Sequence, residues 1–218
     1  MMVVVLGNQD SVLNQFIYEM RDASIQSDSL RFRVNMERAS MVFAYEISKK
    51  LKYKTIEVTT VLGTAEVSVP IDTLVIASIL RAGLSMHNGM LQVFDHAENA
   101  FISAYRKYEH DGGFHIDVEY VSSPDLTQKV LILCDPMLAT GSSMVLCYKE
   151  LLNHGKPIHT HLVSIISSAE GIEYLKQQIP PENYTLWTGA VDDELTAQAY
   201  IVPGLGDAGD LAFGKKVN

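Results

Sequence analysis

The sequence predicts an α/β fold in which a mostly parallel sheet is flanked by helices. Short apolar runs typical of strands alternate with longer stretches in which apolar residues recur at helical spacing. Residues 130–134 are apolar at every position, as expected of a strand that is buried on both faces. With 218 residues and 47% hydrophobic composition, the chain can bury a large core. We therefore expect a single domain over residues 1–218, without a linker or an internal repeat.

The expected elements can be assigned in chain order. An amphipathic helix over residues 29–51 precedes two β-branched, alternating segments, 55–61 and 65–69, which are joined by LeuGlyThr and predict a hairpin arm over about 55–69. The rest of the chain alternates in the order strand 73–77, helix 84–94, strand 100–105, strand 130–134 and the helix after it, strand 162–166, helix 169–177 and strand 184–188. Ligands of such sheets bind beyond the carboxyl ends of the strands.

Composition excludes some classes of function. The net charge of −9 argues against a nucleic-acid partner, because such proteins gain affinity from a basic surface. No apolar run approaches the roughly 20 residues of a membrane span, and MMVVVLGNQD lacks the basic start and long apolar centre of a signal peptide. Cys134 and Cys147 read as reduced core thiols. We therefore expect a cytoplasmic protein with no membrane partner.

The segment from Val130 to Leu152 predicts a phosphate site. Asp135 follows the buried strand, and a loop of small and hydroxyl residues, 140–143, leads into a helix that ends before Gly155 and Pro157. The free N–H groups and the positive end of the helix dipole would face an anion held in this loop. A plain strand-to-helix turn is the alternative reading.

Four segments resemble the uracil phosphoribosyltransferase family. DPMLATGSS, residues 135–143, resembles its binding signature for phosphoribosyl diphosphate (PRPP), and ILRAGLSMHNGML, residues 79–91, resembles its diphosphate-side loop. YIVPGLGDAGDLAFG, residues 200–214, resembles its uracil-recognition loop, and residues 29–48 resemble its N-terminal helix. The resemblance implies a type I phosphoribosyltransferase fold. It also implies a glycosyltransferase of pyrimidine salvage that transfers ribose 5-phosphate from PRPP to N1 of uracil, giving UMP and diphosphate.

The resemblance assigns residues to PRPP. Arg81 and Arg106 match the diphosphate partners, and Asp135 matches the acid beside the ribose, so Asp135 and Arg106 are the catalytic candidates. Asp135 is followed by Pro136 rather than by a second acid, which favours uracil over purine or orotate enzymes. The expected PRPP site comprises Arg81, Arg106, Asp135, Pro136, Met137, Leu138, Ala139, Thr140, Gly141, Ser142, Ser143 and Asp207.

The resemblance also assigns a base-recognition loop over about 200–213, which contains three glycines that allow close approach to a flat ligand. The residues matched to uracil are Ile201, Gly206, Asp207 and Ala208. Mg²⁺ is the expected cofactor, held mainly through PRPP, with Asp207 as the candidate protein ligand. Residues 106–124 match a flexible hood that closes over the substrates; an exposed hairpin without a role is the alternative.

Some features remain open. The chain departs from the family pattern at Ser142, at Leu211, and at Lys107 and Tyr108, where an acid is common; the hood contacts therefore stay undetermined.

The family implies a homodimer or higher homo-oligomer, with the arm as a contact, and GTP is an effector in some relatives. A non-catalytic sensor of PRPP or nucleotides and a phosphoribosyltransferase for another base are the competing functions.

Three further clusters are expected to carry no chemistry. His159 and His161 have metal-like spacing but no accompanying ligand cluster. The acids at 192–194 read as a solvated loop, and Met86 and Met90 as core or subunit contact.

Overall fold

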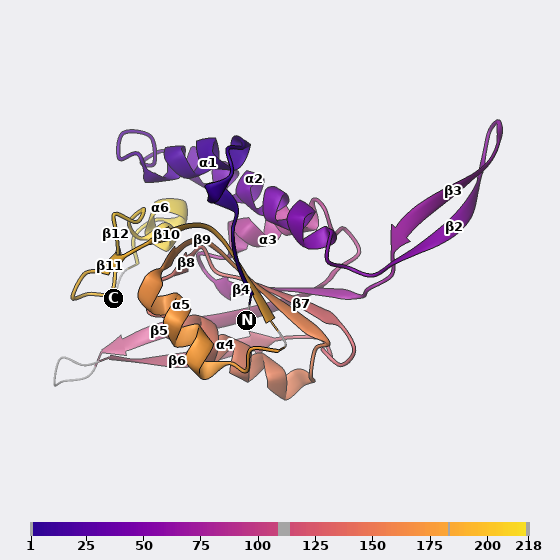
Figure 1. Cartoon of the computed structure of the whole chain (residues 1–218). Coiled ribbons are helices and arrows are strands. Elements are labelled where there is room, and N and C mark those ends of the chain that lie inside the picture. Colours follow the sequence, from indigo (N-terminus) through magenta and orange to yellow (C-terminus); the bar gives the residue numbers. More distant parts are fainter. Residues whose placement is uncertain (1, 109–113, 183, 217–218) are drawn as a thin grey trace.

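A mostly parallel sheet forms the centre of the protein (Figure 1). The computed structural model describes residues 2–108, 114–182 and 184–216. Neighbouring strands pair in parallel, except for the antiparallel pair at one edge, β5 and β6. In spatial order the strands are β1 (Met2–Val5), β10 (Tyr184–Asp192), β9 (His159–Ser168), β7 (Val130–Cys134), β4 (Leu74–Leu80), β5 (Glu98–Tyr108) and β6 (Phe114–Ser122), and β8 (Met137–Leu138) pairs separately with β9. The predicted fold class is confirmed.

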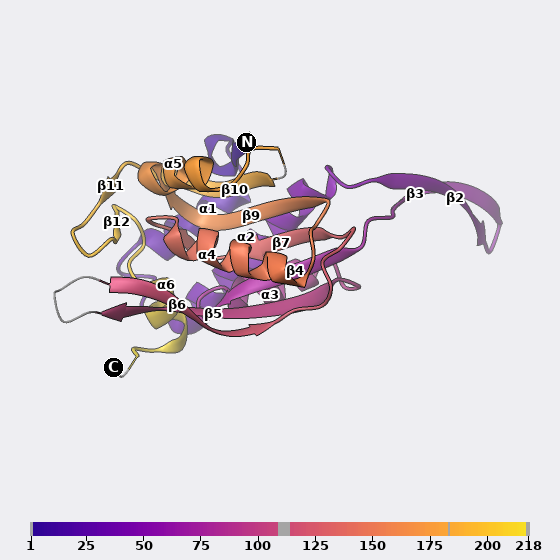
Figure 2. The same ribbon diagram turned by 90° about the horizontal axis from the view of Figure 1, so that it is seen from below.

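Helices cover both faces of this sheet (Figures 1 and 2). One face carries α1 (Val12–Arg21), α2 (Ser29–Ser48) and α3 (Leu84–Leu91), and the other carries α4 (Ser142–Leu151) and α5 (Ala169–Gln178). Side chains of β7 alternate between the two layers: Ile132 packs in the core with α1 and α2, and Leu133 packs in the core with α4 and α5. The continuous apolar run at 130–134 is thus explained by burial on both faces.

Local sequence signals begin several helices. Ser11 caps α1 by accepting a hydrogen bond from Leu13 N, and the main-chain N–H of Ser11 donates to Asn14 Oδ1 in return. Asp28 accepts hydrogen bonds from two main-chain N–H groups at the start of α2, and Ser168 accepts one from Gly171 N at the start of α5. Helix α4 differs, because its N-cap is Gly141, which has no side chain to cap it, and Ser142 N makes only a long hydrogen bond of 3.4 Å to Thr140 Oγ1. Its first N–H groups are therefore suited to a ligand.

The arm is a two-stranded hairpin that projects away from the sheet (Figure 1). It consists of β2 (Tyr53–Thr60) and β3 (Gly63–Pro70), joined by Val61 and Leu62. The expected LeuGlyThr connection, 62–64, is wrong: the turn begins one residue earlier and ends two residues earlier, because Gly63 already pairs with Thr60. Gly63 has φ +155°, a conformation that favours glycine, and thereby closes the two-residue turn.

Several element boundaries differ from the expectations. Strands β4, β5, β9 and β10 extend further than the segments predicted for them, whereas α2 and α3 end earlier, at Ser48 and Leu91. The sequence analysis did not predict β1 or α1. Two short 3₁₀ turns, η1 (Leu6–Asn8) and η2 (Leu152–His154), follow β1 and α4. Strand length depends on which neighbours a strand finds, and this information is not local in the sequence.

The predicted hood, 106–124, contains the end of β5 and all of β6, which pair as far as Tyr108 and Phe114. Residues 109–113, which contain the GlyGly turn, lie outside the described residues. None of the helices in the described part of the chain is long and apolar enough to cross a membrane.

Candidate active site

The predicted phosphate loop lies between β7 and α4. Asp135 follows the last residue of β7, and its main-chain N–H donates to Val163 O on β9 at 3.1 Å. The chain then returns to β9 as β8, where Pro136 O accepts hydrogen bonds from the N–H groups of residues 165 and 166. Gly141 adopts φ +80° and turns the chain into α4. The turn thus brings Asp135 and the uncapped start of α4 to the carboxyl edge of the sheet.

The N-terminal end of α5 contacts this phosphate loop. Ser168 Oγ donates to Ala139 O at 2.5 Å and accepts from Gly171 N at 2.8 Å. Gly171 lies so close to the loop that a Cβ added there would meet Ala139 O at 2.2 Å. Ser168 and Gly171 therefore hold the loop close to α5. Neither residue was assigned a role from the sequence. The one sequence signal for Ser168 is its position directly before the helix predicted over 169–177, where serine is a common N-cap.

The Arg81 loop follows β4, beside the end of β7. Gly83 lets this loop approach closely, because a Cβ there would meet Cys134 O at 2.7 Å. The Arg81 guanidinium donates through Nη2 to Asp210 Oδ1 at 3.2 Å and to Gly214 O at 3.1 Å. Its Nε is buried and has no hydrogen-bond partner among the described residues. The Arg81 side chain as a whole is 38% exposed, so part of the guanidinium remains accessible to an anionic ligand.

A buried histidine, His87, joins α3 to β5 and to β4, the strand that leads into the Arg81 loop. His87 on α3 contacts Ser78 Oγ through Nδ1 at 2.9 Å and Asn99 Oδ1 through Nε2 at 2.6 Å. Burial lowers the pKa of His87, against the opposing effect of its bond to Asn99. Since Asn99 Oδ1 can only accept, Nε2 carries the proton and donates to it. His87 is therefore a neutral structural group.

The base-recognition loop closes the site from the C-terminal side. Strands β11 (Glu194–Leu195) and β12 (Ile201–Val202) pair at its base, and α6 (Ala208–Phe213) forms its end. Asp207 caps α6 by accepting a hydrogen bond from Asp210 N at 2.9 Å. The sequence analysis expected only a glycine-rich loop here, whereas the last part is helical. Gly206 takes φ +85° immediately before this helix.

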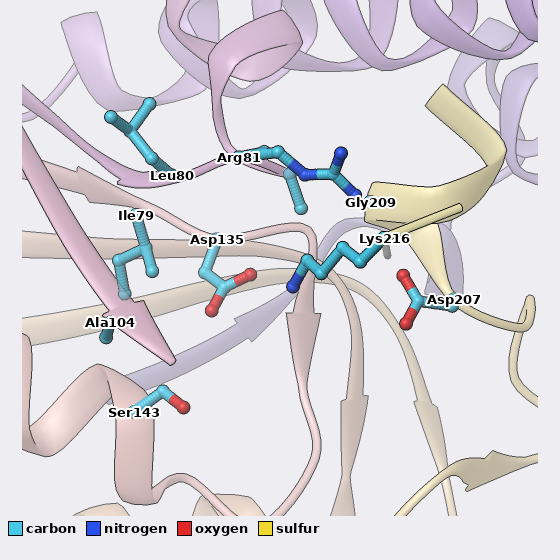
Figure 3. Close-up of a pocket in the computed structure, with 10 residues that line it drawn as sticks. Ile79, Leu80, Arg81, Ala104, Asp135, Ser143, Asp207, Gly209 and Lys216 are labelled. Atoms are coloured by element: carbon cyan, nitrogen blue, oxygen red, sulfur yellow. The ribbon is translucent and has the colours of Figure 1, made fainter. Parts of the chain in front are cut away.

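One cavity of about 130 Å³ joins these parts (Figure 3). Its polar lining comes from Arg81, Asp135, Ser143, Asp207 and Lys216. Figure 3 shows the Lys216 amine between the carboxylates of Asp135 and Asp207. Lys216 was missed because it follows the last recognisable motif. Residues from three separate sequence segments, 79–91, 135–143 and 200–214, therefore line one cavity.

Other expected site residues do not line this cavity. The main chain of Arg106 lies in β5, but its side chain is outside what the structure describes. Pro136, Met137 and Leu138 contribute main chain to the sheet beside β9. The remaining loop residues, Ala139, Thr140, Gly141 and Ser142, lie next to Ser143, and Thr140 Oγ1 contacts Ser142 Oγ at 3.2 Å.

The uracil candidates Ile201, Gly206 and Ala208 belong to the loop that reaches the cavity at Asp207. Ile201 and Ala208 are buried, so their side chains fix the loop rather than offer a polar surface.

The expectation for the acids at 192–194 is wrong for Asp192. Asp192 is 8% exposed, ends β10 and pairs with Arg21. Arg21 lies 171 positions away in the sequence, so no local pattern indicated this partner. Asp193 and Glu194 are exposed, as expected of a solvated turn.

The remaining clusters lie in the core. Cys134 and Cys147 are free and buried, and burial raises the pKa of both thiols, so they stay protonated and unreactive. Met86 and Met90 are buried in the core with α2, as predicted. His161 accepts a hydrogen bond from Trp187 Nε1, and burial lowers its pKa to about 3.

The fold and the loop after β7 define the class of type I phosphoribosyltransferases. A solved structure of a protein from Aquifex aeolicus superimposes with a TM-score of 0.86 at 29% identity, covering 100% of both chains. A hypoxanthine phosphoribosyltransferase from Staphylococcus aureus shares the fold, with a TM-score of 0.50 and 12% identity over 75% of this chain and 76% of that chain.

Sequence comparisons identify the family within this class. A family model described as uracil phosphoribosyltransferase matches residues 8–215. The chain is 56% identical to a uracil phosphoribosyltransferase from Porphyromonas gingivalis over 217 residues, covering 100% of both. A uracil phosphoribosyltransferase from Methanothermobacter thermautotrophicus is 40% identical over 191 residues, 86% of each chain. The chain belongs to the uracil phosphoribosyltransferase family.

Proposed function

We propose that this protein transfers ribose 5-phosphate from PRPP to N1 of uracil, giving UMP and diphosphate in pyrimidine salvage. Family membership supports the reaction, and one structural observation supports the site. The uncapped start of α4, Asp135 and Arg81 surround the same cavity at the carboxyl edge of the sheet. Such an edge is where ligands of open α/β sheets bind.

The 5′-phosphate would bind at the start of α4. Main-chain N–H groups of residues 141–143 and the hydroxyls of Thr140 and Ser143 offer donors, and the helix dipole adds partial positive charge. Ser142 in place of a glycine keeps an N–H and adds a hydroxyl. Asp135 then lies on the ribose side of the phosphate.

The reaction separates charge, so the protein acts by electrostatics and positioning. As the bond from C1 to diphosphate lengthens, positive charge grows on the sugar and negative charge grows on the leaving group. Asp135 accepts hydrogen bonds from ribose hydroxyls and favours the positive sugar. Arg81 and Arg106 bind the diphosphate, for which a guanidinium fork is well suited. The hood would exclude water when it closes.

Uracil would be read by the main chain of residues 201–208. The base presents two carbonyl oxygens and two N–H groups, which main-chain donors and acceptors can match without a charged side chain. The buried side chains of Ile201 and Ala208 hold this segment in place. Gly206, with φ +85°, is exposed and directly precedes Asp207, which lines the cavity.

Mg²⁺ fits the oxygen donors of this site. Asp207 and Asp135 both face the cavity with carboxylate oxygens, the ligand type that Mg²⁺ prefers. Within the described ranges no three His, Cys, Asp or Glu side chains form a metal-binding group, so the phosphates of PRPP and water would supply most ligands. Mg²⁺ bound there would neutralise charge on the diphosphate.

We further propose a cytoplasmic homodimer or higher homo-oligomer. Val61 and Leu62 at the tip of the arm are 100% and 95% exposed, an arrangement that favours contact with a second copy. We also propose GTP as an effector, so that added GTP changes the rate of UMP formation. Light scattering that finds a monomer would contradict the oligomer.

The function is tested by incubating the protein with PRPP, Mg²⁺ and a panel of uracil, cytosine, hypoxanthine and orotate. We expect diphosphate release and UMP formation with uracil alone. Turnover with another base instead would assign a different phosphoribosyltransferase. Calorimetric binding of PRPP or UMP without turnover at any magnesium or effector concentration would identify a sensor.

A further inference from the structure

Asp192 is a buried acid that the reaction does not use. Its carboxylate accepts three hydrogen bonds: Arg21 Nη1 donates to Oδ2 at 2.8 Å, Arg21 Nη2 donates to Oδ1 at 2.8 Å, and Gly204 N donates to Oδ2 at 2.9 Å. Arg21 is the last residue of α1, and Asp192 is the last residue of β10. The pair therefore joins two elements to the base-recognition loop.

Arg21 also binds the main-chain carbonyl of Gly204. Arg21 Nη1 donates to Gly204 O at 2.8 Å, so the main-chain N–H and C=O of this residue are both fixed by the ion pair. Gly204 has φ +56° and turns back tightly onto Ile201. Gly206 and Asp207 follow two and three positions later. A shift of Gly204 would move the segment proposed to read the base.

We propose that Arg21 and Asp192 are positioning residues that set the place of the base-recognition loop and thereby the affinity for the pyrimidine base. The proposal rests on the proposed function. Neither side chain reaches the cavity that contains Asp135 and Arg81, so the pair acts through Gly204. Its loss should weaken binding of the base while the PRPP site stays intact.

The chain supplies a matched control for this pair. Glu19, also on α1 and 7% exposed, accepts hydrogen bonds from Arg31 Nε at 2.6 Å and Arg31 Nη2 at 2.8 Å. The further partners of Glu19 are Asn35 on α2 and Gln15 on α1. Both pairs are two-pronged arginine–carboxylate bridges, but only the Arg21–Asp192 pair is bonded to the loop. Comparing them separates positioning of the loop from stabilisation of the fold.

The experiment measures kcat, KM for uracil, KM for PRPP and the unfolding temperature. The test variants are Asp192→Asn, which keeps side-chain size, and Arg21→Lys, which keeps the positive charge but removes the guanidinium fork. The matched controls are Glu19→Gln and Arg31→Lys. We expect KM for uracil to rise roughly 10-fold in both test variants, the effect of losing one charge-assisted hydrogen bond that holds the site. KM for PRPP should stay within about 2-fold, the precision that separates a specific from a general effect.

The control variants should lower the unfolding temperature and leave KM for uracil unchanged. The double variant Arg21→Lys with Asp192→Asn should raise KM no further than the larger single change, since both act through Gly204. A wild-type KM for uracil in either folded test variant would overturn the proposal, as would an equal rise in Glu19→Gln. Wild-type protein that forms no UMP would overturn the proposed function, and the inference with it.

Discussion

Replacing Gly171 with alanine should displace the phosphate loop without touching a ligand. A Cβ at this position would lie 2.2 Å from Ala139 O, whereas real Cβ atoms are essentially never closer than 3.0 Å to such an atom. The loop or α5 must therefore move by at least 0.8 Å, the difference between these two distances. Both neighbours are main chain, so no flexible side chain can absorb the shift.

A displacement of about 1 Å at a positioning element can lower catalysis about 100-fold. We expect kcat/KM for PRPP to fall by about this factor in Gly171→Ala, with a rise in KM for PRPP that exceeds any rise in KM for uracil. Steady-state UMP formation at varied PRPP measures the change. Calorimetric titration with PRPP gives the binding part separately.

Gly7→Ala is the matched control, because a Cβ there would meet Gly189 O, also at 2.2 Å, but between η1 and β10, and neither residue lines the cavity with Asp135. Both variants should lower the unfolding temperature, and Gly171→Ala should show the larger effect on PRPP. Equal losses of stability with an unchanged kcat/KM for PRPP in Gly171→Ala would refute the reasoning that α5 sets the loop.

Three further predictions concern individual charges. Asp135→Asn should lower kcat by about 100-fold, since an isosteric amide no longer favours positive charge on the ribose, and an unchanged rate would remove Asp135 from the mechanism. Arg81→Ala and Arg106→Ala should each raise KM for PRPP and lower turnover, with circular dichroism confirming an intact fold; near-normal kinetics in either would exclude that arginine. Glu19→Gln should make the free energy of unfolding depend less on pH in the acid range. Hydrogen bonds from Arg31, Asn35 and Gln15 lower the pKa of Glu19 from 4.5 to about 2, so its contribution is present above pH 4.5 and lost as the pH falls towards 2. Unfolding midpoints across that range measure this loss, and parallel curves for variant and wild type would contradict it.

The phosphate loop could be predicted from the sequence because its signals are local. The buried strand at 130–134, Asp135 after it and Gly141 before the helix all lie within one short segment. Strand β7 has the predicted bounds, and α4 begins at Ser142 inside the expected loop. The resemblance to the family added the Arg81 loop and the base-recognition loop, which line the same cavity as this segment.

The contacts that hold these loops in place could not be predicted, because their partners are distant in the sequence. Ser168 supports Ala139 from 29 positions away, and Arg21 reaches Asp192 from 171 positions away. The acids at 192–194 looked solvated in the sequence, since charge alone does not reveal a buried partner. Packing of α1 against β10 buries Asp192, and α1 itself was not predicted.

The most direct test of this account is a crystal structure with UMP and diphosphate bound. We predict the 5′-phosphate at the main-chain N–H groups of residues 141–143, Asp135 against the ribose hydroxyls, diphosphate at Arg81, and uracil against the main chain of residues 206–208. A 5′-phosphate bound away from the start of α4, or a base that contacts none of residues 201–208, would contradict it.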